Sequence, residues 1–141
     1  MGHIGLTPQT VSKLGGFKIQ GKGDAAQKVL EDALALEAAG AYAIVLECIP
    51  EELGKLITQK LSIPTIGIGG GRYTDGQVLV FHDMMGLFEK FVPKFVKQYL
   101  NLSPEIVKAL EQFKQDVKSG EFPEAQHTFG GVSEEELKRL Y

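Results

Sequence analysis

Cysteine is scarce in this chain, and long apolar runs and a strong excess of one charge are absent. The only cysteine, Cys48, excludes an internal disulfide framework and fits a reducing compartment. The longest apolar runs are well below the ~20 residues that a membrane-spanning helix requires, and no signal-peptide pattern opens the sequence. From these absences we expect a soluble, cytoplasmic protein with no membrane partner.

The charges are balanced rather than concentrated. The 15 basic and 18 acidic residues give a formal net charge of −3 and are mixed along the chain, so no basic stretch indicates a nucleic-acid partner. With 141 residues, 43% of them hydrophobic, the chain can form one folded domain with its own core. It is too short for a complete (β/α)8 barrel, which usually needs about 250 residues.

An apolar run at residues 41–46 is the most informative pattern. It lacks the alternation of a half-exposed strand and is typical of a strand buried on both faces of a parallel sheet. Glu47 ends the run, and Pro50 predicts the start of a helix over residues 51–60. In α/β folds, ligands and catalytic groups gather at the carboxyl ends of such strands. Glu47 is therefore a candidate functional carboxylate, although a structural carboxylate neutralised by a lysine or a backbone amide would give the same pattern.

Strands and helices alternate through the first part of the chain. We expect strands at residues 1–6, 41–47, 62–68 and 78–81, and helices over residues 24–39 and 51–60. Asp24 is a suitable N-cap and Gly40 a suitable left-handed C-cap for the first helix. The alternation predicts an α/β fold with a parallel sheet and right-handed crossovers.

Further polar residues and glycines follow the same strand ends. His3 lies at the end of the first expected strand, and His82 and Asp83 follow the last. A histidine at such a place is either a ligand or a hydrogen-bonded structural residue. The glycines at residues 69–71 either let the backbone approach a ligand or only permit the turn. The glycine-rich stretch at residues 15–23 has no nucleotide-binding spacing and is either a mobile lid or a plain connector.

The last third of the chain is expected to be helical. Aromatic spacing over residues 88–99 predicts a helix with an aromatic face, and a clear amphipathic helix over residues 103–119 follows it. Ser133 and Glu136 form a capping box for a short C-terminal helix. His127 has no acidic or thiol neighbours at the spacing of metal ligands, which favours a packing role in its loop.

Several motifs occur in register along the chain. They are GHIGLTPQ at residues 2–9, VLECIP at 45–50, IPTIGIGGG at 63–71, DGQ at 75–77 with Val80 and His82-Asp83 after it, and FVPKFVK at 91–97. Together they closely resemble the ketopantoate hydroxymethyltransferase family, over residues 2 to about 129. The resemblance implies an α/β fold, the C-terminal half of a (β/α)8 TIM barrel with about four parallel strands and additional C-terminal helices. Residues 1–129 would form the partial barrel domain and residues 130–141 a C-terminal helical tail.

The resemblance also implies a reaction and a set of site residues. In that family a hydroxymethyl group passes from 5,10-methylenetetrahydrofolate to 3-methyl-2-oxobutanoate, giving 2-dehydropantoate in pantothenate biosynthesis. Glu47 would be the catalytic general base that removes the proton next to the keto group. His3 and Val80 would bind the substrate. The candidates for the pocket rim are Gly69, Gly70, Asp75, His82 and Asp83.

The family also uses Mg²⁺, which holds the oxygens of the keto acid and takes up enolate charge. Its carboxylate ligands, and a lysine that pairs with the substrate, belong to earlier strands of the family's barrel. This sequence has no counterpart of those strands. We therefore expect Mg²⁺ as cofactor and the folate as co-substrate of the complete site, no metal ligand in this chain, and no activity from the chain alone.

Three functions remain open. The chain could supply one part of the transferase, active with an N-terminal half-barrel partner, or it could be a truncated, non-catalytic half-barrel that self-associates or binds such a partner. Open sheet edges, and inner-face residues such as Ile44, Leu46 and Ile66, would favour a homo-oligomer. The third function is that of a related barrel lyase acting on a 2-oxo acid, and the LECIP and DGQ motifs favour the transferase over it.

Overall fold

The computed structural model describes residues 1–141, which form two compact units, Met1–Leu100 and Asn101–Tyr141. The first unit contains one sheet of four parallel strands in the order β1-β2-β3-β4. The strands are β1 (Gly2–Gly5), β2 (Ile44–Glu47), β3 (Thr65–Ile68) and β4 (Gly76–Gln77). The expected α/β class with about four parallel strands is confirmed. Their spatial order follows the sequence order, as it does along part of a βα barrel.

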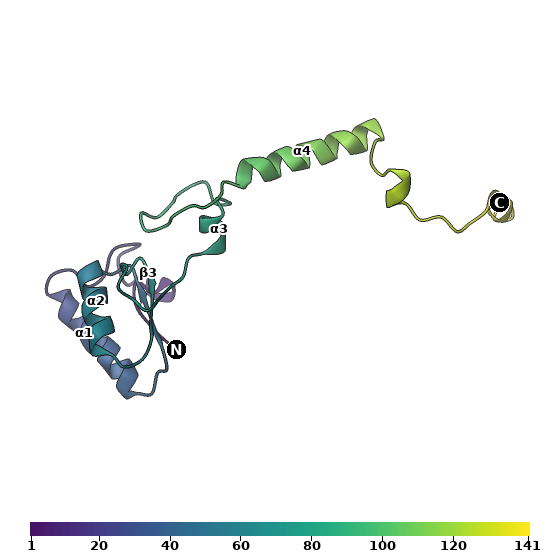
Figure 1. Cartoon of the computed structure of the whole chain (residues 1–141). Helices are drawn as coiled ribbons and strands as arrows, with labels where there is room; N and C mark the ends of the chain where they lie inside the picture. Colours follow the sequence, from purple (N-terminus) through teal and green to yellow (C-terminus); the bar gives the residue numbers. More distant parts are fainter. The chain divides into compact units, whose positions relative to one another are not determined.

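Two helices cover one face of this sheet. Helix α1 (Ala25–Ala38) follows β1, helix α2 (Glu51–Lys60) follows β2, and the two lie side by side against the strands (Figure 1). Each connects one parallel strand to the next, which is the form of a βαβ crossover. Buried residues of both helices join those of the strands in one apolar core. Its members are Ile4, Ala33, Ile44, Leu46, Ile49, Leu53, Ile57 and Leu61.

Alternation along β2 decides which of its side chains face the helices. Ile44 and Leu46 are fully buried in the core with residues of α1 and α2. Val45 and Glu47 point to the opposite face, because successive side chains of a strand alternate, and they are only partly buried. The expectation that Ile44 and Leu46 lie on an exposed inner face is therefore wrong. The polar end of the strand, Glu47, is on the face that the helices leave open.

The helix boundaries follow the sequence signals with one exception. Helix α1 ends before Gly40, which has the predicted left-handed conformation at φ +93. Helix α2 follows Pro50 and carries Glu51 and Glu52 in its first turn. Asp24 precedes α1, but its side chain makes no capping hydrogen bond, because its backbone is already helical at φ −62 and ψ −23. A capping side chain requires a non-helical, typically extended, backbone at that position.

The fourth strand is shorter than predicted and ends earlier. β4 covers only Gly76–Gln77, and Phe81–Met84 forms helix α3 where the end of a strand was expected. The last hydrogen bond of the ladder runs from the Val78 amide to the Gly67 carbonyl at 3.0 Å. β4 is thus a two-residue edge strand that pairs with β3 alone.

Residues 88–99 contain no helix, contrary to the prediction from their aromatic spacing. Pro93 stands within this segment, where it removes an amide donor and disfavours helical geometry in the residue before it. The segment instead returns to the end of α3, where the Tyr99 amide donates to the Met84 carbonyl at 2.9 Å. It therefore forms a long loop over the first unit, and its aromatic side chains are available for contacts other than a helix face.

The second unit consists of helical pieces. Helix α4 (Ser103–Ser119) ends at the left-handed Gly120, and η2 (Ala125–His127) and α5 (Glu134–Lys138) follow it. The predicted capping box of α5 is present between Ser133 and Glu136.

Aromatic packing within this unit is limited. The His127 ring packs against Phe122 with centroids 5.4 Å apart, in agreement with a packing role. Helix α4 buries no residue. The exposed large apolar residues of this helix are Ile106, Val107, Leu110, Phe113 and Val117. No helix of the chain has the length and apolar character needed to cross a membrane.

Candidate active site

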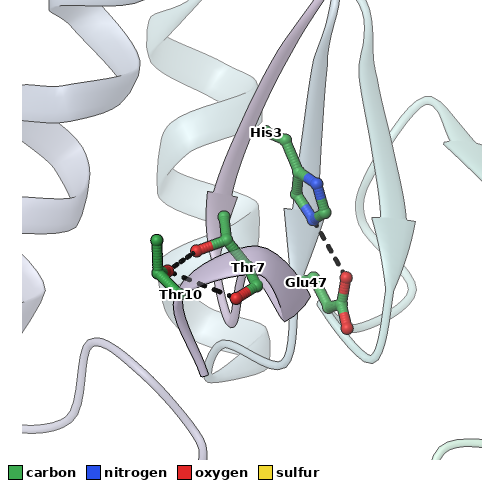
Figure 2. A network of polar contacts seen from close by, with 4 residues as sticks. All are labelled: His3, Thr7, Thr10 and Glu47. Carbon is green, nitrogen blue, oxygen red and sulfur yellow. Dashed lines mark hydrogen bonds and ion pairs between the residues drawn. The ribbon is translucent and has the colours of Figure 1, made fainter. Parts of the chain in front are cut away.

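His3 and Glu47 meet on the face of the sheet that the helices leave open. His3 lies on β1 and Glu47 ends the neighbouring β2, with His3 paired in register to Val45. Figure 2 shows the imidazole directed toward the carboxylate, and His3 Nε2 lies 2.9 Å from Glu47 Oε2. The two side chains are 31% and 15% exposed, so they are shielded from bulk water while remaining reachable. The structure thus brings together the predicted base and the predicted substrate-binding histidine.

Gly5 makes this diagonal contact possible. In the register of the sheet Gly5, not His3, is directly opposite Glu47. It has φ +89, and a Cβ added there would lie only 2.1 Å from the Glu47 carbonyl oxygen. The same oxygen accepts a 2.9 Å hydrogen bond from the Leu6 amide. The glycine therefore lets β1 approach the end of β2 closely, and it leaves the space beside the carboxylate free of a competing side chain.

The residue after Glu47 turns the chain sharply away from the strand. Cys48 has φ +48, the one non-glycine residue of the chain with positive φ. Its amide donates to the Ile68 carbonyl at 2.9 Å, and its carbonyl accepts from the Gln20 amide at 2.8 Å. These hydrogen bonds hold Cys48 in a backbone conformation that costs a non-glycine residue about 1–2 kcal/mol. Strained backbone of this kind is common beside functional sites. Burial and the neighbouring Glu47 charge raise the pKa of the Cys48 thiol, which makes it a poor nucleophile at neutral pH.

A cavity of about 690 Å³ opens at this end of the sheet and includes Glu47 in its wall. Of the other predicted site residues, Gly69, Val80 and Asp83 line the same cavity. His3 reaches the site through its contact with Glu47. Much of the wall is apolar, and the loops after β1 and α3 contribute to it. Their lining residues include Phe17, Lys18, Ile19, Phe91, Pro93, Lys94 and Phe95.

The glycines after β3 approach other parts of the protein closely. A Cβ on Gly69 would lie 2.7 Å from the Phe95 ring, and one on Gly70 would lie 2.9 Å from the Leu46 carbonyl oxygen. A Cβ on Gly54 of α2 would meet the Gly70 carbonyl at 2.2 Å. Gly70 is thus packed between β2 and α2, whereas Gly69 borders the cavity. Both alternatives for this stretch apply, since the glycines permit close packing and two of them, Gly69 and Gly71, line the cavity.

Asp75 lies at the other end of the sheet. Its Oδ2 accepts hydrogen bonds from the Thr65 amide at 2.8 Å and from the Thr65 hydroxyl at 3.0 Å, and these lower the pKa of the Asp75 carboxyl. Thr65 is fully buried and begins β3, whereas Ile68 beside Glu47 ends it. The structure therefore does not bring Asp75 to the cavity. The carboxylate instead fixes the loop that leads into β4.

His82 is separated from the cavity although its neighbour Asp83 lines it. Both belong to α3, and His82 is exposed with its ring edge-on to Phe81 at a centroid distance of 6.0 Å. The adjacent positions diverge because successive residues of a helix point in directions about 100° apart. No contact links His82 to His3 or Glu47.

The side chains present do not fit a magnesium ion. No group of three or more His, Cys, Asp or Glu residues in the chain could hold a metal, and Mg²⁺ requires octahedral oxygen ligands at short distances. Glu47 Oε2 already accepts a hydrogen bond from His3 when Nε2 carries the proton.

Sequence reasoning missed the loop residues that complete the cavity. Phe17 and Lys18 belong to the glycine-rich stretch that was interpreted as a lid or a connector, and Phe91 and Lys94 to the expected aromatic helix. The FVPKFVK motif was the available signal, because its Pro93 argues against a helix and its exposed Phe and Lys side chains then need another role.

Comparison with known proteins agrees with this geometry. A sequence profile described as Ketopantoate hydroxymethyltransferase matches residues 1–125. The chain belongs to the ketopantoate hydroxymethyltransferase family. It is 58% identical to the 3-methyl-2-oxobutanoate hydroxymethyltransferase of Heliobacterium modesticaldum, over 142 aligned residues that cover 100% of this chain and 51% of the relative. Proteins of the same name from Clostridium beijerinckii and Syntrophomonas wolfei are each 56% identical to it, with the same coverage.

The resemblance stated from the motifs is thereby confirmed. The chain spans about half the length of the curated relatives that it matches. Together with the parallel strands placed in sequence order, this agrees with the expected half of a TIM barrel. The family belongs to pantothenate biosynthesis and consists of transferases, so a barrel lyase is no longer the competing interpretation.

Proposed function

We propose that this chain forms the proton-abstracting part of a 3-methyl-2-oxobutanoate hydroxymethyltransferase, with Glu47 as the general base. The supporting observation is the His3–Glu47 contact of 2.9 Å in the wall of the cavity. Glu47 accepts the proton from the carbon next to the keto group, and the resulting enolate carbon attacks the methylene of 5,10-methylenetetrahydrofolate. A carbon–carbon bond and a carbon–oxygen bond to a water oxygen form at the methylene carbon, and both of its bonds to folate nitrogens break. The two nitrogens take up the proton removed from the keto acid and a proton from the water, and the products are 2-dehydropantoate and tetrahydrofolate. One water is consumed in opening the folate's methylene bridge.

His3 orients the base in this proposal. With its proton on Nε2 it donates to Oε2 of Glu47, which leaves Oε1 directed at the substrate carbon. A general base must lie within hydrogen-bond reach of the proton that it removes, and a fixed carboxylate meets that condition more often than a free one. Val80 is half exposed and lines the cavity, where it would contact the isopropyl group of the keto acid. Gly69 and Asp83 complete the rim on that side.

The rest of the site belongs, in our proposal, to a second half-barrel. The chain covers about half of its relatives, and β1 and β4 are open edges that offer unpaired backbone groups to further strands. Mg²⁺ binding, which the residues of this chain do not fit, is assigned to that missing half. We also propose 5,10-methylenetetrahydrofolate as the donor, a homo-oligomeric state and a cytoplasmic location. A non-catalytic half-barrel that uses the same edges to self-associate is the alternative.

The experiment isolates proton removal from the folate reaction. The chain is combined in trans with the segment of the Heliobacterium modesticaldum relative that it does not cover. Exchange of deuterium into carbon 3 of the keto acid is followed by NMR without folate. We expect Glu47→Gln, which keeps the shape but cannot take the proton, to slow exchange by about 10²–10⁴-fold. Glu52→Gln, an exposed carboxylate in the first turn of α2, is the matched control and should exchange like the parent.

Two results would count against the proposal. Exchange in Glu47→Gln at the parent rate would show that another group is the base. Absence of exchange in the combined parent proteins, with the sheet edges shown to be paired by hydrogen exchange, would favour the non-catalytic half-barrel.

A further inference from the structure

Residues 15–19 form a loop beside the cavity whose two ends are held very differently. At the first end, Gly16 has φ +97, and no atom lies within 4 Å of the position that a Cβ would take. At the second end, Gly21 has φ +75, and a Cβ there would lie only 2.6 Å from the Leu53 side chain. Unpacked glycine backbone changes its dihedral angles at little cost. The first end can therefore act as a hinge, whereas the second is packed against α2.

Hydrogen bonds show the same difference between the two ends. The Gln20 amide donates to the Cys48 carbonyl at 2.8 Å, which fastens the second end beside the residue that follows Glu47. Within the loop the bonds are local. The Lys18 amide donates to the Gly16 carbonyl at 2.9 Å, and the Lys18 carbonyl accepts from Gln20 Nε2 at 2.9 Å. The loop between its ends is thus tied to itself rather than to the sheet or the helices.

The loop exposes two large apolar side chains at the cavity. Phe17 is 79% and Ile19 51% exposed, and both line the same cavity as Glu47. Apolar surface in water is unfavourable, but a cavity of about 690 Å³ without a ligand offers the loop nothing to pack against. A ligand beside Glu47 supplies that surface. Filling the cavity therefore favours movement of the loop onto the ligand.

The charges in the cavity wall point to a contact for the moved loop. The loops contribute Lys18 and Lys94, and the regular elements contribute Glu47, Glu51 and Asp83. Neither lysine makes an ion pair within the chain, whereas Glu47 pairs with His3. Glu51 Oε1 lies 3.4 Å from Arg72 Nε, and these two side chains are 39% and 78% exposed. An ion pair this exposed is weak, so Glu51 can accept a second cation.

The fixed end of the loop selects Glu51 as the partner of Lys18. Lys18 is two residues before Gln20, a stretch of at most about 7 Å, and the Gln20 amide is bonded to the Cys48 carbonyl. Glu51 begins α2 three residues after Cys48. The long, flexible lysine side chain starts close to this carboxylate and reaches it through a change at the hinge alone.

On the basis of the function proposed above, we infer that residues 15–19 are a lid that closes over the keto acid bound at Glu47. Gly15 and Gly16 are its hinge, and the packed Gly21 is its fixed end. In the closed state the Phe17 ring covers the ligand and Lys18 pairs with Glu51. Closure keeps bulk water away from the enolate while it reacts.

Limited digestion with chymotrypsin, which cleaves after accessible aromatic residues, tests the lid. The chain is combined in trans with the Heliobacterium modesticaldum segment as above and digested with and without 3-methyl-2-oxobutanoate. Mass spectrometry follows cleavage after Phe17 and after Phe129, a fully exposed residue of the second unit. We expect the keto acid to slow cleavage after Phe17 several-fold, since cleavage follows the population of the open loop. Cleavage after Phe129 should not change.

Charge variants separate closure from simple shielding by the ligand. With the keto acid present, Lys18→Gln and Glu51→Gln should each be cleaved after Phe17 up to about fivefold faster than the parent, the factor equivalent to an exposed ion pair. The double variant should lose no more protection than either single variant, because both changes remove the same pair. Glu52→Gln is the matched control, since this neighbouring carboxylate does not line the cavity, and it should be protected like the parent.

Three results would overturn the inference. They are no protection at Phe17, equal protection at Phe129, and full protection in Glu51→Gln, which would show that the ligand alone shields the ring. Glu47→Gln should keep the protection, because closure requires binding but no proton transfer. Protection without Glu47-dependent exchange therefore counts against the proposed base alone, and exchange without protection counts against the lid alone.

Discussion

Replacing Gly5 by alanine is expected to destabilise the chain and displace its candidate base. Gly5 has φ +89, a conformation that costs a residue with a side chain about 1–2 kcal/mol. The added Cβ would lie 2.1 Å from the Glu47 carbonyl oxygen, far inside van der Waals contact, so β1 has to move away from β2. That movement weakens the hydrogen bond from the Leu6 amide to the same oxygen, 2.9 Å long and worth about 0.5–1.5 kcal/mol.

These contributions give a loss of about 1.5–3.5 kcal/mol in the free energy of unfolding of Gly5→Ala. This is a large share of the ~5–15 kcal/mol that stabilises a typical domain. Unfolding in urea would be followed by far-UV circular dichroism, because the chain has no tryptophan for fluorescence. The midpoint is compared with that of the parent at equal protein concentration.

Gly40→Ala is the matched control for the free-energy cost of placing a residue with a side chain at positive φ. Gly40 has φ +93, close to that of Gly5, but no atom lies within 4 Å of the position that its Cβ would take. The control therefore carries the conformational penalty without the collision. If Gly5→Ala loses no more stability than Gly40→Ala, β1 and β2 are not held together at this point. In that case the close approach does not fix the position of Glu47, and the reasoning is refuted.

Two further predictions concern the rest of the first unit. Hydrogen bonds from Thr65 lower the pKa of Asp75 in the folded chain. The stability that the ionised carboxylate adds to the fold is therefore complete above the ordinary pKa of 3.8, and it is lost as the pH falls through the lower pKa of the folded state. Asp75→Asn should therefore unfold at a lower urea concentration than the parent near pH 6, and the difference between the two midpoints should disappear in strong acid. A difference that does not depend on pH would contradict this. The isolated chain should also self-associate through β1 and β4, and light scattering that shows a stable monomer would contradict that self-association. The isolated chain should lack transferase activity.

Local patterns in the sequence were enough to predict the elements around the site. The apolar run that ends at Glu47 is a strand, Pro50 precedes a helix, Gly40 ends one, and Ser133 caps another. Each of these signals acts within a few residues, through backbone conformation, hydrogen bonds to nearby amides or the period of apolar side chains. The family was also available from the sequence, because its motifs lie in register over residues that the profile match confirms.

Tertiary structure decided the features that depend on pairing between distant segments. The register of β1 against β2 places Gly5 opposite Glu47 and brings His3 to the carboxylate from 44 positions away. No local pattern contains that register. The same holds for Asp75, whose sequence position after β3 suggested the cavity, but whose hydrogen bonds are to Thr65 at the start of that strand.

The loops show most clearly which features the sequence alone does not predict. The sequence patterns place Phe17 in a stretch that is either a mobile lid or a plain connector and Phe91 on a helix face, and only the folded chain places both in the wall of one cavity. The sequence by itself determined the strand that carries Glu47, the helices beside it and the family. The tertiary structure decided which faces and loops surround that carboxylate, because strand register and loop closure are set by contacts between residues far apart in the chain.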